Sequence, residues 1–181
     1  MKPVAIAIIF RYKAKKVEIM TQLRLVKNKS YDPLYDRTHE AIGETLDKHE
    51  TGWPKETFLA AAIRGIREEC GRPDFEPVGV YGADMKLLEH CMVDTGKGDS
   101  YFACEPFCLV QSLGPPQPWF GPAFLVEAAS DFEPDYANAD GEADEHTWWA
   151  PLDLLAAMEA DPSRFMGLHL EPLRLAATEL S

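Results

Sequence analysis

The chain has 181 residues, of which 46% are hydrophobic, and its formal net charge is −12 at pH 7. This length and composition are typical of one globular domain with an ample core, and no apolar run approaches the roughly 20 residues of a membrane span. Because Lys and Arg do not gather into a stripe, we do not expect binding to the phosphates of a polymeric nucleic acid. The chain could still bind a small anionic substrate, but a bound cation would have to neutralise the substrate's charge.

The N-terminal sequence MKPVAIAIIFR lacks a signal-peptide cleavage pattern, so we expect a cytoplasmic protein. The chain has four cysteines, Cys70, Cys91, Cys104 and Cys108, and they form no C-x-x-C pair. Cys104 and Cys108 are too sparse for a zinc site without further partners. We therefore expect buried, reduced thiols.

The first third of the chain predicts a β-hairpin followed by polar loops. Residues 2–12 are almost all apolar, which is typical of a strand buried on both faces. Residues 17–25 alternate loosely and predict the partner strand across a short turn. A polar loop follows at 27–39, then a short strand at 40–43 and a long polar loop at 44–55.

Beyond a helix at 56–71, short strands and loops alternate. The predicted elements are strands at 77–82, 101–110 and 123–128, a turn at 94–100, a rigid proline-rich loop at 115–122, an acidic loop at 131–145, a strand from 146 that runs into a helix beginning near Pro151 and ending at Ala160, and a final helix at 168–180. The chain has no internal repeat or composition break. The order of elements predicts one α/β domain over residues 1–181, with a mixed sheet and helices on both faces.

The helix at 56–71 carries the chemistry-bearing residues. At about 100° per residue, Glu69 falls inside the edge of the buried arc, and Glu68 faces outward. Gly65 lies between these acids, where glycine costs a helix about 1 kcal/mol relative to alanine. A carboxylate at a core margin needs a partner, and paired carboxylates around a gap suit a hard cation such as Mg²⁺. The alternative is a solvated face with an Arg64–Glu68 ion pair.

This stretch resembles the Nudix box, G-x5-E-x7-R-E-U-x-E-E-x-G-U, in which U is a bulky apolar residue. The residues in register with the box are Glu56, Arg64, Ile66, Glu68, Glu69 and Gly71. The chain departs from the box at Gly65, where the pattern has Glu, and at Arg72, where it has an apolar residue. The leading Gly would fall on Glu50. A displaced candidate is Gly43 in E-A-I-G, which is similar to the E-x-P-G-G strand end that precedes the box.

The resemblance implies a Nudix-like α/β/α sandwich with a loop-helix-loop catalytic motif. It also implies a metal-dependent hydrolase that acts on a nucleoside diphosphate linked to another group. Glu68 and Glu69 would bind Mg²⁺ or Mn²⁺, with a carbonyl near Gly43 as a further oxygen ligand. Arg64 would orient the glutamates, and Glu56 would brace the helix.

Gly65 removes the glutamate that some family members use as general base. Other members take the base from a loop near the end of the domain, and here that loop is the acidic stretch 131–145. The W-W-A-P-L-D-L-L sequence that follows is similar to the strand and helix start that commonly end a Nudix domain. Glu145 and Glu142 are the best placed bases, with Glu145 slightly preferred and Asp144 third.

Substrate contacts are suggested by a third patch and by the early loops. The run Q-P-W-F-G-P at 117–122 is similar to a motif of NADH pyrophosphatases, in which Trp119 would stack on a nucleobase, although a buried proline-rich turn is the alternative. This patch lies far beyond the box, so we expect an insertion around 82–122. Four residues of the early loops are further candidates: Tyr31 and Tyr35 for stacking, Arg37 and Lys55 for phosphate charge.

Three interpretations follow. The first is a hydrolase of a small nucleotide-type substrate, with ADP-ribose, dinucleotides and nucleoside triphosphates all open. The second is a Nudix-fold binding module without catalysis, which Gly65, Glu50 and Arg72 motivate. The third is an unrelated α/β domain with a chance helix pattern. A homodimer is open as well, since homodimers are frequent in the family.

Overall fold

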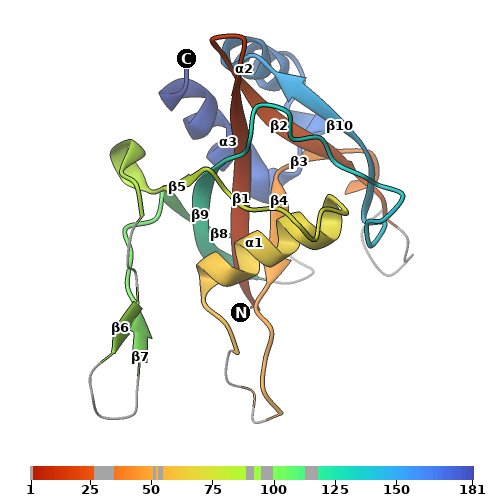
Figure 1. The fold of residues 1–181 in the computed structure, drawn as a ribbon. Coiled ribbons are helices and arrows are strands. Elements are labelled where there is room, and N and C mark those ends of the chain that lie inside the picture. Colours follow the sequence, from red (N-terminus) through yellow and green to blue (C-terminus); the bar gives the residue numbers. More distant parts are fainter. Residues whose placement is uncertain are drawn as a thin grey trace.

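The computed structural model describes residues 2–26, 35–50, 52, 55–88, 92–94, 100–112 and 118–181. The strands are β1 (Lys2–Lys13), β2 (Lys16–Arg24), β3 (His39–Glu40), β4 (Ile42–Thr45), β5 (Gly79–Tyr81), β6 (Met92–Asp94), β7 (Ser100–Phe102), β8 (Cys108–Gln111), β9 (Trp119–Glu127) and β10 (Ala143–Trp149) (Figure 1). The helices are α1 (Phe58–Glu69), α2 (Pro151–Ala160) and α3 (Gly167–Glu179), with 3₁₀ turns η2 (Ala83–Met85) and η3 (Pro162–Arg164). None of these described helices is long and apolar enough to cross a membrane. The sequence-based expectations for 27–34, 95–99, Cys91 and Gln117 lie outside the described residues.

Eight of the described strands form one mixed sheet. Its main path runs β10-β2-β1-β9-β5, with β3 beside β2, β4 beside β1 and β8 beside β9. β1 and β9 are parallel, and the other pairs in the sheet are antiparallel. β6 and β7 form a separate hairpin that extends away from the sheet (Figure 1). The mixed sheet predicted from the sequence is confirmed.

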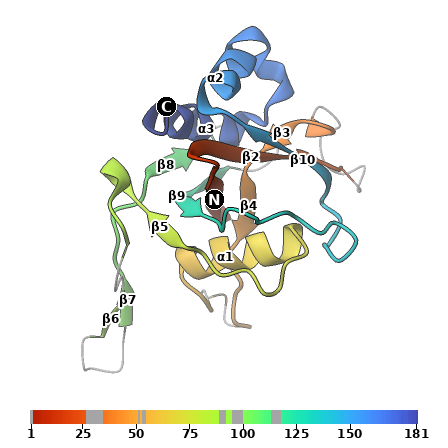
Figure 2. The same cartoon turned by 45° about the horizontal axis from the view of Figure 1, so that its top comes forward.

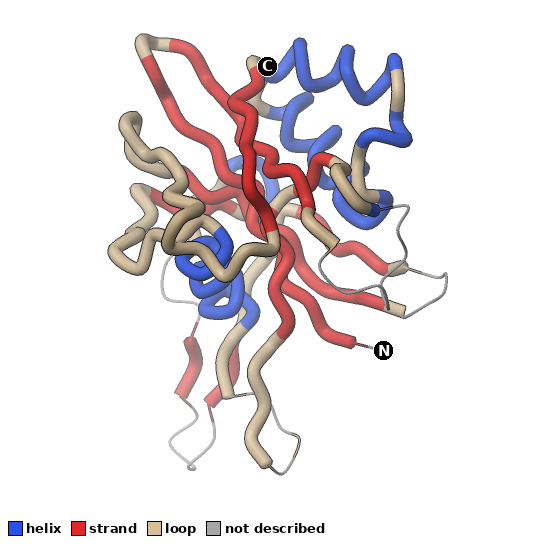
Figure 3. The backbone as a smooth tube through the Cα atoms, turned by 90° about the vertical axis from the view of Figure 1, so that its right-hand side faces the viewer, coloured by secondary structure: helices blue, strands red, loops and turns tan. Residues whose placement is uncertain are grey.

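The central strand β1 separates two hydrophobic cores. Its buried residues alternate between them: Ala5, Ala7 and Ile9 pack in the core under α1, and Ile6, Ile8 and Phe10 pack in the core under α2 and α3. Figure 2 shows α1 on one side of the sheet and α2 and α3 on the other, and Figure 3 shows the same layers from the side. The predicted α/β/α sandwich is confirmed, and so is the prediction of a first strand buried on both faces.

Helix α1 is bounded by local signals in its sequence. The Thr57 hydroxyl accepts a hydrogen bond from the Ala60 amide at 3.1 Å, which caps the first turn. Gly71 follows the helix with a φ of +61°, a left-handed conformation that glycine adopts without strain. Ala61, Ala62 and Ile66 face the core, and full burial of a side chain such as Ile66 contributes about 1.5–3 kcal/mol.

The strand predicted at 101–110 is wrong as one continuous element. β7 ends at Phe102 and pairs with β6, whereas β8 begins at Cys108 and joins the main sheet. Pro106, in the connection, lacks the N–H that a strand ladder needs. The connection also crosses Gly82, where a Cβ would lie 1.9 Å from the Glu105 carbonyl oxygen. A largely apolar stretch therefore spans two strands of different sheets.

The proline-rich loop predicted at 115–122 is wrong from Trp119 onward, because β9 begins there. The parallel pairing of β9 with β1 includes Phe120, is interrupted, and resumes at Ala123. Pro122, which has no N–H to donate, falls in this interruption. A Cβ at Gly121 would lie 1.6 Å from the Val4 carbonyl oxygen, so the close crossing requires glycine.

Candidate functional site

Arg64 organises one group of acids on the outer face of α1. Its Nη2 donates to Glu56 Oε1 at 2.7 Å and to the Thr45 carbonyl oxygen at 2.8 Å. Its Nη1 donates to Glu68 Oε2 at 3.0 Å and lies 3.3 Å from Glu44 Oε2. The hydrogen bond to Glu56 raises the pKa of Arg64, so the guanidinium stays charged. This geometry suits the predicted roles of Arg64 and Glu56, because one fixed cation holds the start of α1, β4 and Glu68 together.

A second group of acids is buried around Gln22 of β2. Glu69 is only 2% exposed, and its carboxylate accepts a hydrogen bond from Gln22 Nε2. The same amide nitrogen lies 3.4 Å from Glu40 Oε1, and Glu40 is 1% exposed. Arg24 is the basic partner, with its Nη1 3.1 Å from Glu40 Oε2. The inward position that the helical count predicts for Glu69 is the position that the structure shows.

Burial raises the pKa of both acids in this second group. The pKa of Glu40 rises to about 7, because desolvation outweighs the attraction of Arg24. Burial raises the pKa of Glu69 well above its usual value, and the neighbouring charges of Glu40 and Glu142 raise it further. Two like-charged carboxylates in a buried site with one guanidinium are short of positive charge.

The amide nitrogen of Gln22 is turned to both buried acids, since the Nε2 donates to Glu69 and lies 3.4 Å from Glu40 Oε1. The other end, Oε1, is buried and has no hydrogen-bond partner among the described residues. An oxygen without a donor beside two acids is a place where a cation or a water would be favourable.

The acidic loop is attached to the C-terminal end of α1. The Asp135 amide donates to the Cys70 carbonyl oxygen at 2.8 Å, and the Asp140 amide donates to the Glu68 carbonyl oxygen at 3.1 Å. These bonds satisfy carbonyl groups that a helix end leaves without partners. They also bring the residues after Asp140 to the side of the helix that carries Glu69.

The predicted bases occupy different surroundings. Glu142 lies beside the end of β2, where its carbonyl oxygen accepts a hydrogen bond from the Leu25 amide at 2.7 Å, and its charge raises the pKa of Glu40, Glu44 and Glu69. Glu145 and Asp144 instead form ion pairs with Arg37, at 2.8 Å and 2.6 Å. Both residues lie on β10, which begins at Ala143, so the acidic loop predicted at 131–145 ends at residue 142. Arg37 is thereby occupied by β10, in a different environment from the phosphate contact predicted for it.

Gly43 lies on β4, where it forms a close contact with α3. A Cβ at this position would lie 3.0 Å from two atoms of the His169 ring. Burial lowers the pKa of His169 to about 3, so the ring is neutral, and it packs directly against Gly43. The backbone of β4 at Gly43 is therefore held between β1 and α3.

No contact among the described residues brings the remaining substrate candidates to the acids. Trp119 is the first residue of β9, opposite Lys2, whose Nζ lies 5.0 Å from the centroid of the indole ring. Tyr35 contributes its backbone carbonyl, which accepts a hydrogen bond from the Thr38 hydroxyl at 2.8 Å. Lys55 contributes its amide to the Asp47 carbonyl oxygen at 2.8 Å. Tyr31 lies outside the described residues.

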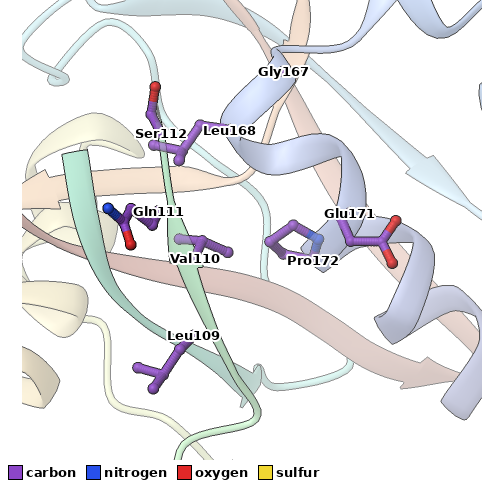
Figure 4. Close-up of a pocket in the computed structure, with 8 residues that line it drawn as sticks. All are labelled: Leu109, Val110, Gln111, Ser112, Gly167, Leu168, Glu171 and Pro172. Atoms are coloured by element: carbon purple, nitrogen blue, oxygen red, sulfur yellow. The ribbon is translucent and has the colours of Figure 1, made fainter. Parts of the chain in front are cut away.

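A cavity of about 330 Å³ lies between β8 and α3, on the face of the sheet opposite α1. Its lining residues are Leu109, Val110, Gln111, Ser112, Gly167, Leu168, Glu171 and Pro172 (Figure 4). Its single carboxylate, Glu171, accepts a hydrogen bond from Arg174 Nε at 2.8 Å. With one paired acid, this cavity lacks the converging polar groups of a catalytic site, and the acids of α1 remain the candidate.

The side chains of the candidate site fit a divalent cation in their chemistry. Among the residues that the structure describes, no three His, Cys, Asp or Glu side chains converge as a ready-made metal site. Glu68 is turned to Arg64, and Glu69 to Gln22. The donors are nevertheless carboxylate and amide oxygens, which Mg²⁺ and Mn²⁺ prefer. The shortage of positive charge at Glu40 and Glu69, and the unpartnered Gln22 oxygen, are what such a cation would relieve.

Sequence reasoning missed three residues of this site. Gln22 and Glu40 gather on neighbouring strands through the pairing of β2 with β3, and Glu44 points to Arg64 from β4. Glu40 had one usable signal, because it opens the E-A-I-G sequence that is similar to the strand end before the box. A polar residue inside the hairpin strand β2 was the signal for Gln22.

The chain is similar in structure to several known proteins, although its sequence matches none of the known family models. No protein-family model matches the sequence, and no curated protein matches it. Among solved structures, the NUDIX domain of Shewanella oneidensis NrtR in complex with ADP ribose has a TM-score of 0.62 at 15% identity, covering 100% of this chain and 89% of that chain. A Nudix hydrolase from Alicyclobacillus acidocaldarius has a TM-score of 0.59 at 15% identity, covering 100% and 93%.

A third similar structure is a binary complex of the Caenorhabditis elegans Ap4A hydrolase, with a TM-score of 0.58 at 15% identity, covering 98% of this chain and 96% of that chain. The similarity extends over nearly the whole of both chains in each comparison. At this identity it shows the fold. The chain therefore has the Nudix fold, as the resemblance of its helix motif predicts.

Proposed function

We propose that this chain is a metal-dependent hydrolase of a nucleoside diphosphate derivative, which cleaves a phosphoric anhydride bond with water. The observation that supports the proposal most directly is the position of Glu68 and Glu69 at the end of α1 on a Nudix fold, with Arg64 fixed between Glu56 and Glu68. The similar structures include an Ap4A hydrolase and a complex with ADP ribose. Small nucleotides with a diphosphate linkage are therefore the substrate class that we propose.

The site would hold Mg²⁺ or Mn²⁺ through Glu68 and Glu69, with the Gly43 carbonyl as a further ligand. When bound, the cation neutralises phosphate oxygens and lowers the pKa of a coordinated water. Arg64 holds Glu68 at a fixed place on the helix face and is itself held by Glu56. Gln22 and Glu40 support Glu69 from the buried side.

We assign the general base to Glu142. A base must reach the attacking water, so it has to lie among the acids that position that water. Glu142 is held beside the end of β2 by the hydrogen bond from the Leu25 amide, and its charge raises the pKa of Glu40, Glu44 and Glu69. Glu145, which the sequence slightly favoured, is 60% exposed in its side chain and is held by Arg37. Its carboxylate would have to leave this ion pair before it could act.

Gly65 favours a second candidate function, a Nudix-fold module that binds a nucleotide without cleaving it. The box carries Glu at this position, and no carboxylate can come from glycine. Both candidates predict nucleotide binding. Metal-dependent turnover separates them, because only the hydrolase releases phosphate-containing products.

The test is hydrolysis of a panel of NADH, ADP-ribose, dinucleoside polyphosphates and nucleoside triphosphates, with Mg²⁺ or Mn²⁺ and with EDTA as control. Added phosphatase exposes monophosphate products. We expect release from one compound class, abolished by EDTA. Nucleotide binding without release from any compound would establish the binding module instead.

The Glu68→Gln and Glu69→Gln variants test the residues of the site. Each should lower turnover by more than the roughly 10–100-fold that loss of a residue behind a metal ligand costs. Glu76→Gln is the matched control, because Glu76 is 80% exposed in its side chain and pairs with Arg67, another arginine of α1. Wild-type turnover in both site variants would contradict the assignment.

A further inference from the structure

The space beside Gly65 is filled by side chains of β4. A Cβ at Gly65 would lie 2.8 Å from Glu44 Cβ and 3.1 Å from Ile42 Cγ2, both too close for an undisturbed contact. α1 and β4 therefore pack together more tightly here than any larger residue allows. While Glu44 keeps its present position, a glutamate cannot replace Gly65.

Glu44 is itself a departure from the pattern before the box. In the alignment of E-A-I-G-E with E-x-P-G-G, residue 44 takes the place of the second glycine. The chain thus has a glutamate where the pattern has glycine, and glycine where the box has a glutamate. These two positions are in contact in the structure. One carboxylate is lost from α1, and one is gained directly opposite on β4.

The Glu44 carboxylate points to the same atom as Glu68. Its Oε2 lies 3.3 Å from Arg64 Nη1, and Glu68 Oε2 lies 3.0 Å from that nitrogen. The two oxygens are therefore within about 6 Å of each other by geometry. Nε and Nη2 of Arg64 are turned to Glu56, which leaves Nη1 as the positive group between Glu44 and Glu68. A divalent cation that both carboxylates bind would lie beside this nitrogen and would compete with it for their oxygens.

We propose that Glu44 is a metal ligand of this site and supplies, from β4, a carboxylate next to the position at which the box has one on α1. The inference rests on the proposed function, since it concerns the same cation. It also gives Gly65 a reason: the glycine makes room for Glu44. The departure from the box at Gly65 is then matched by a carboxylate on β4, and the proposed hydrolase keeps the acid that it needs.

The experiment measures Mn²⁺ binding to the free protein by the loss of the free Mn²⁺ paramagnetic resonance signal, together with turnover on the substrate found in the panel. Glu44→Gln keeps the side-chain shape and should weaken Mn²⁺ binding by about 10-fold or more, since it removes a charged ligand. Glu76→Gln, which changes the exposed partner of Arg67, should bind Mn²⁺ like wild type. Thermal unfolding confirms that each variant is folded.

The second part of the experiment exchanges the residues at positions 44 and 65. Glu44→Gly should weaken Mn²⁺ binding at least as much as Glu44→Gln. Adding Gly65→Glu to Glu44→Gly should return the affinity to within about threefold of wild type, because it places a carboxylate from α1 in the space that Glu44 leaves. Gly65→Glu alone should not improve binding, because Glu44 occupies the space that the new side chain needs.

Wild-type Mn²⁺ affinity in Glu44→Gln overturns the inference, whether or not turnover falls, because Glu44 would then act only through its ion pair with Arg64. If the exchanged variant does not fold, Glu44→Gln still decides the question. Failure of the wild-type protein to bind Mn²⁺ is a different result, since it contradicts the proposed function itself.

Discussion

At the scale of single residues, the site is built from acids whose burial differs sharply. Glu69 and Glu40 are almost fully buried around Gln22, whereas the Glu68 side chain is 48% exposed beside Arg64. Burial without enough positive charge favours the protonated form of a carboxyl. The buried pair therefore costs stability when it is ionised, and that cost is the property expected of a site prepared for a cation.

The buried pair predicts a pH dependence of stability without metal. A folded-state pKa raised above its unfolded value means that the folded state keeps a proton that the unfolded chain has lost. The free energy of unfolding should therefore fall as pH rises from about 4.5 to about 7, the range set by Glu40. The Glu40 contribution amounts to at most about 3 kcal/mol.

Glu40→Gln should reduce this fall, since glutamine has no proton to lose. Urea unfolding in EDTA at pH 5, 6 and 7.5 measures the difference from wild type, so that other titrating groups, such as His169, cancel. Glu76→Gln serves as the exposed control. Identical pH profiles for wild type and Glu40→Gln would show that the Glu40 carboxyl is not desolvated as the structure has it.

At the scale of elements, the acidic loop is a second support of the site. It is anchored at one end by Glu133, whose Oε1 lies 2.8 Å from the buried Arg11, and along its length by the terminal carbonyls of α1. Bonds from Arg11, Trp148 and His146 outweigh the effect of burial and lower the pKa of Glu133 to about 2, so this anchor stays charged. The position of Glu142 follows from these attachments.

Gly71 is the point where helix and loop meet, and Gly71→Ala should break that contact. A Cβ there would lie 2.0 Å from the Asp135 carbonyl oxygen, and the φ of +61° disfavours alanine as well. We expect a loss of about 2 kcal/mol or more in the free energy of unfolding. We also expect lower turnover, because Glu142 would move with the loop.

Gly167→Ala is the matched control, since a Cβ at Gly167 meets nothing within 4 Å. The measurement is the urea midpoint together with turnover at saturating metal. A Gly71→Ala variant with the wild-type midpoint would mean that the loop rearranges freely and that its attachment to α1 does not position Glu142.

At the scale of the whole molecule, the sequence indicated the elements that have a regular local pattern of apolar residues. It did not indicate the contacts between segments that lie far apart in the chain. The apolar run of β1, the helical spacing of α1 and the proline that opens α2 each predict their element, because each signal is local. β7 and β8 read as one strand, because apolar alternation does not record a change of sheet. The start of β9 was hidden by Pro122, whose place in the ladder depends on β1.

The residues of the candidate site also fall into two sets, those that the sequence indicated and those that only the assembled sheet brings together. Glu56, Arg64, Glu68 and Glu69 follow from spacing along one helix and from a resemblance tied to that spacing. Gln22, Glu40 and Glu44 belong to strands that reach α1 only when the sheet is assembled, so local signals at Gln22 and Glu40 do not show that these residues meet Glu69. The contact between Gly65 and Glu44 is of this kind, and it changes the meaning of a single-residue departure from the box.

The net charge of −12 makes cation binding a property of the whole molecule as well as of one site. A cation bound only by the folded state, at 100 times its dissociation constant, adds about 2.7 kcal/mol to the free energy of unfolding. For a chain of this size that corresponds to a rise of about 5–10 °C in the unfolding temperature. We expect Mn²⁺ to produce this rise at constant ionic strength, and Glu69→Gln to remove most of it.

General screening of the acidic surface gives a different signature, because it depends on ionic strength and not on the identity of the ion. NaCl at matched ionic strength is therefore the comparison for each thermal scan, and EDTA should reverse the Mn²⁺ effect. A specific site yields a shift that saturates with Mn²⁺ concentration and disappears in the variant. An equal shift with NaCl, or an undiminished one in Glu69→Gln, would assign the effect to the surface charge and remove the cation from the acids of α1.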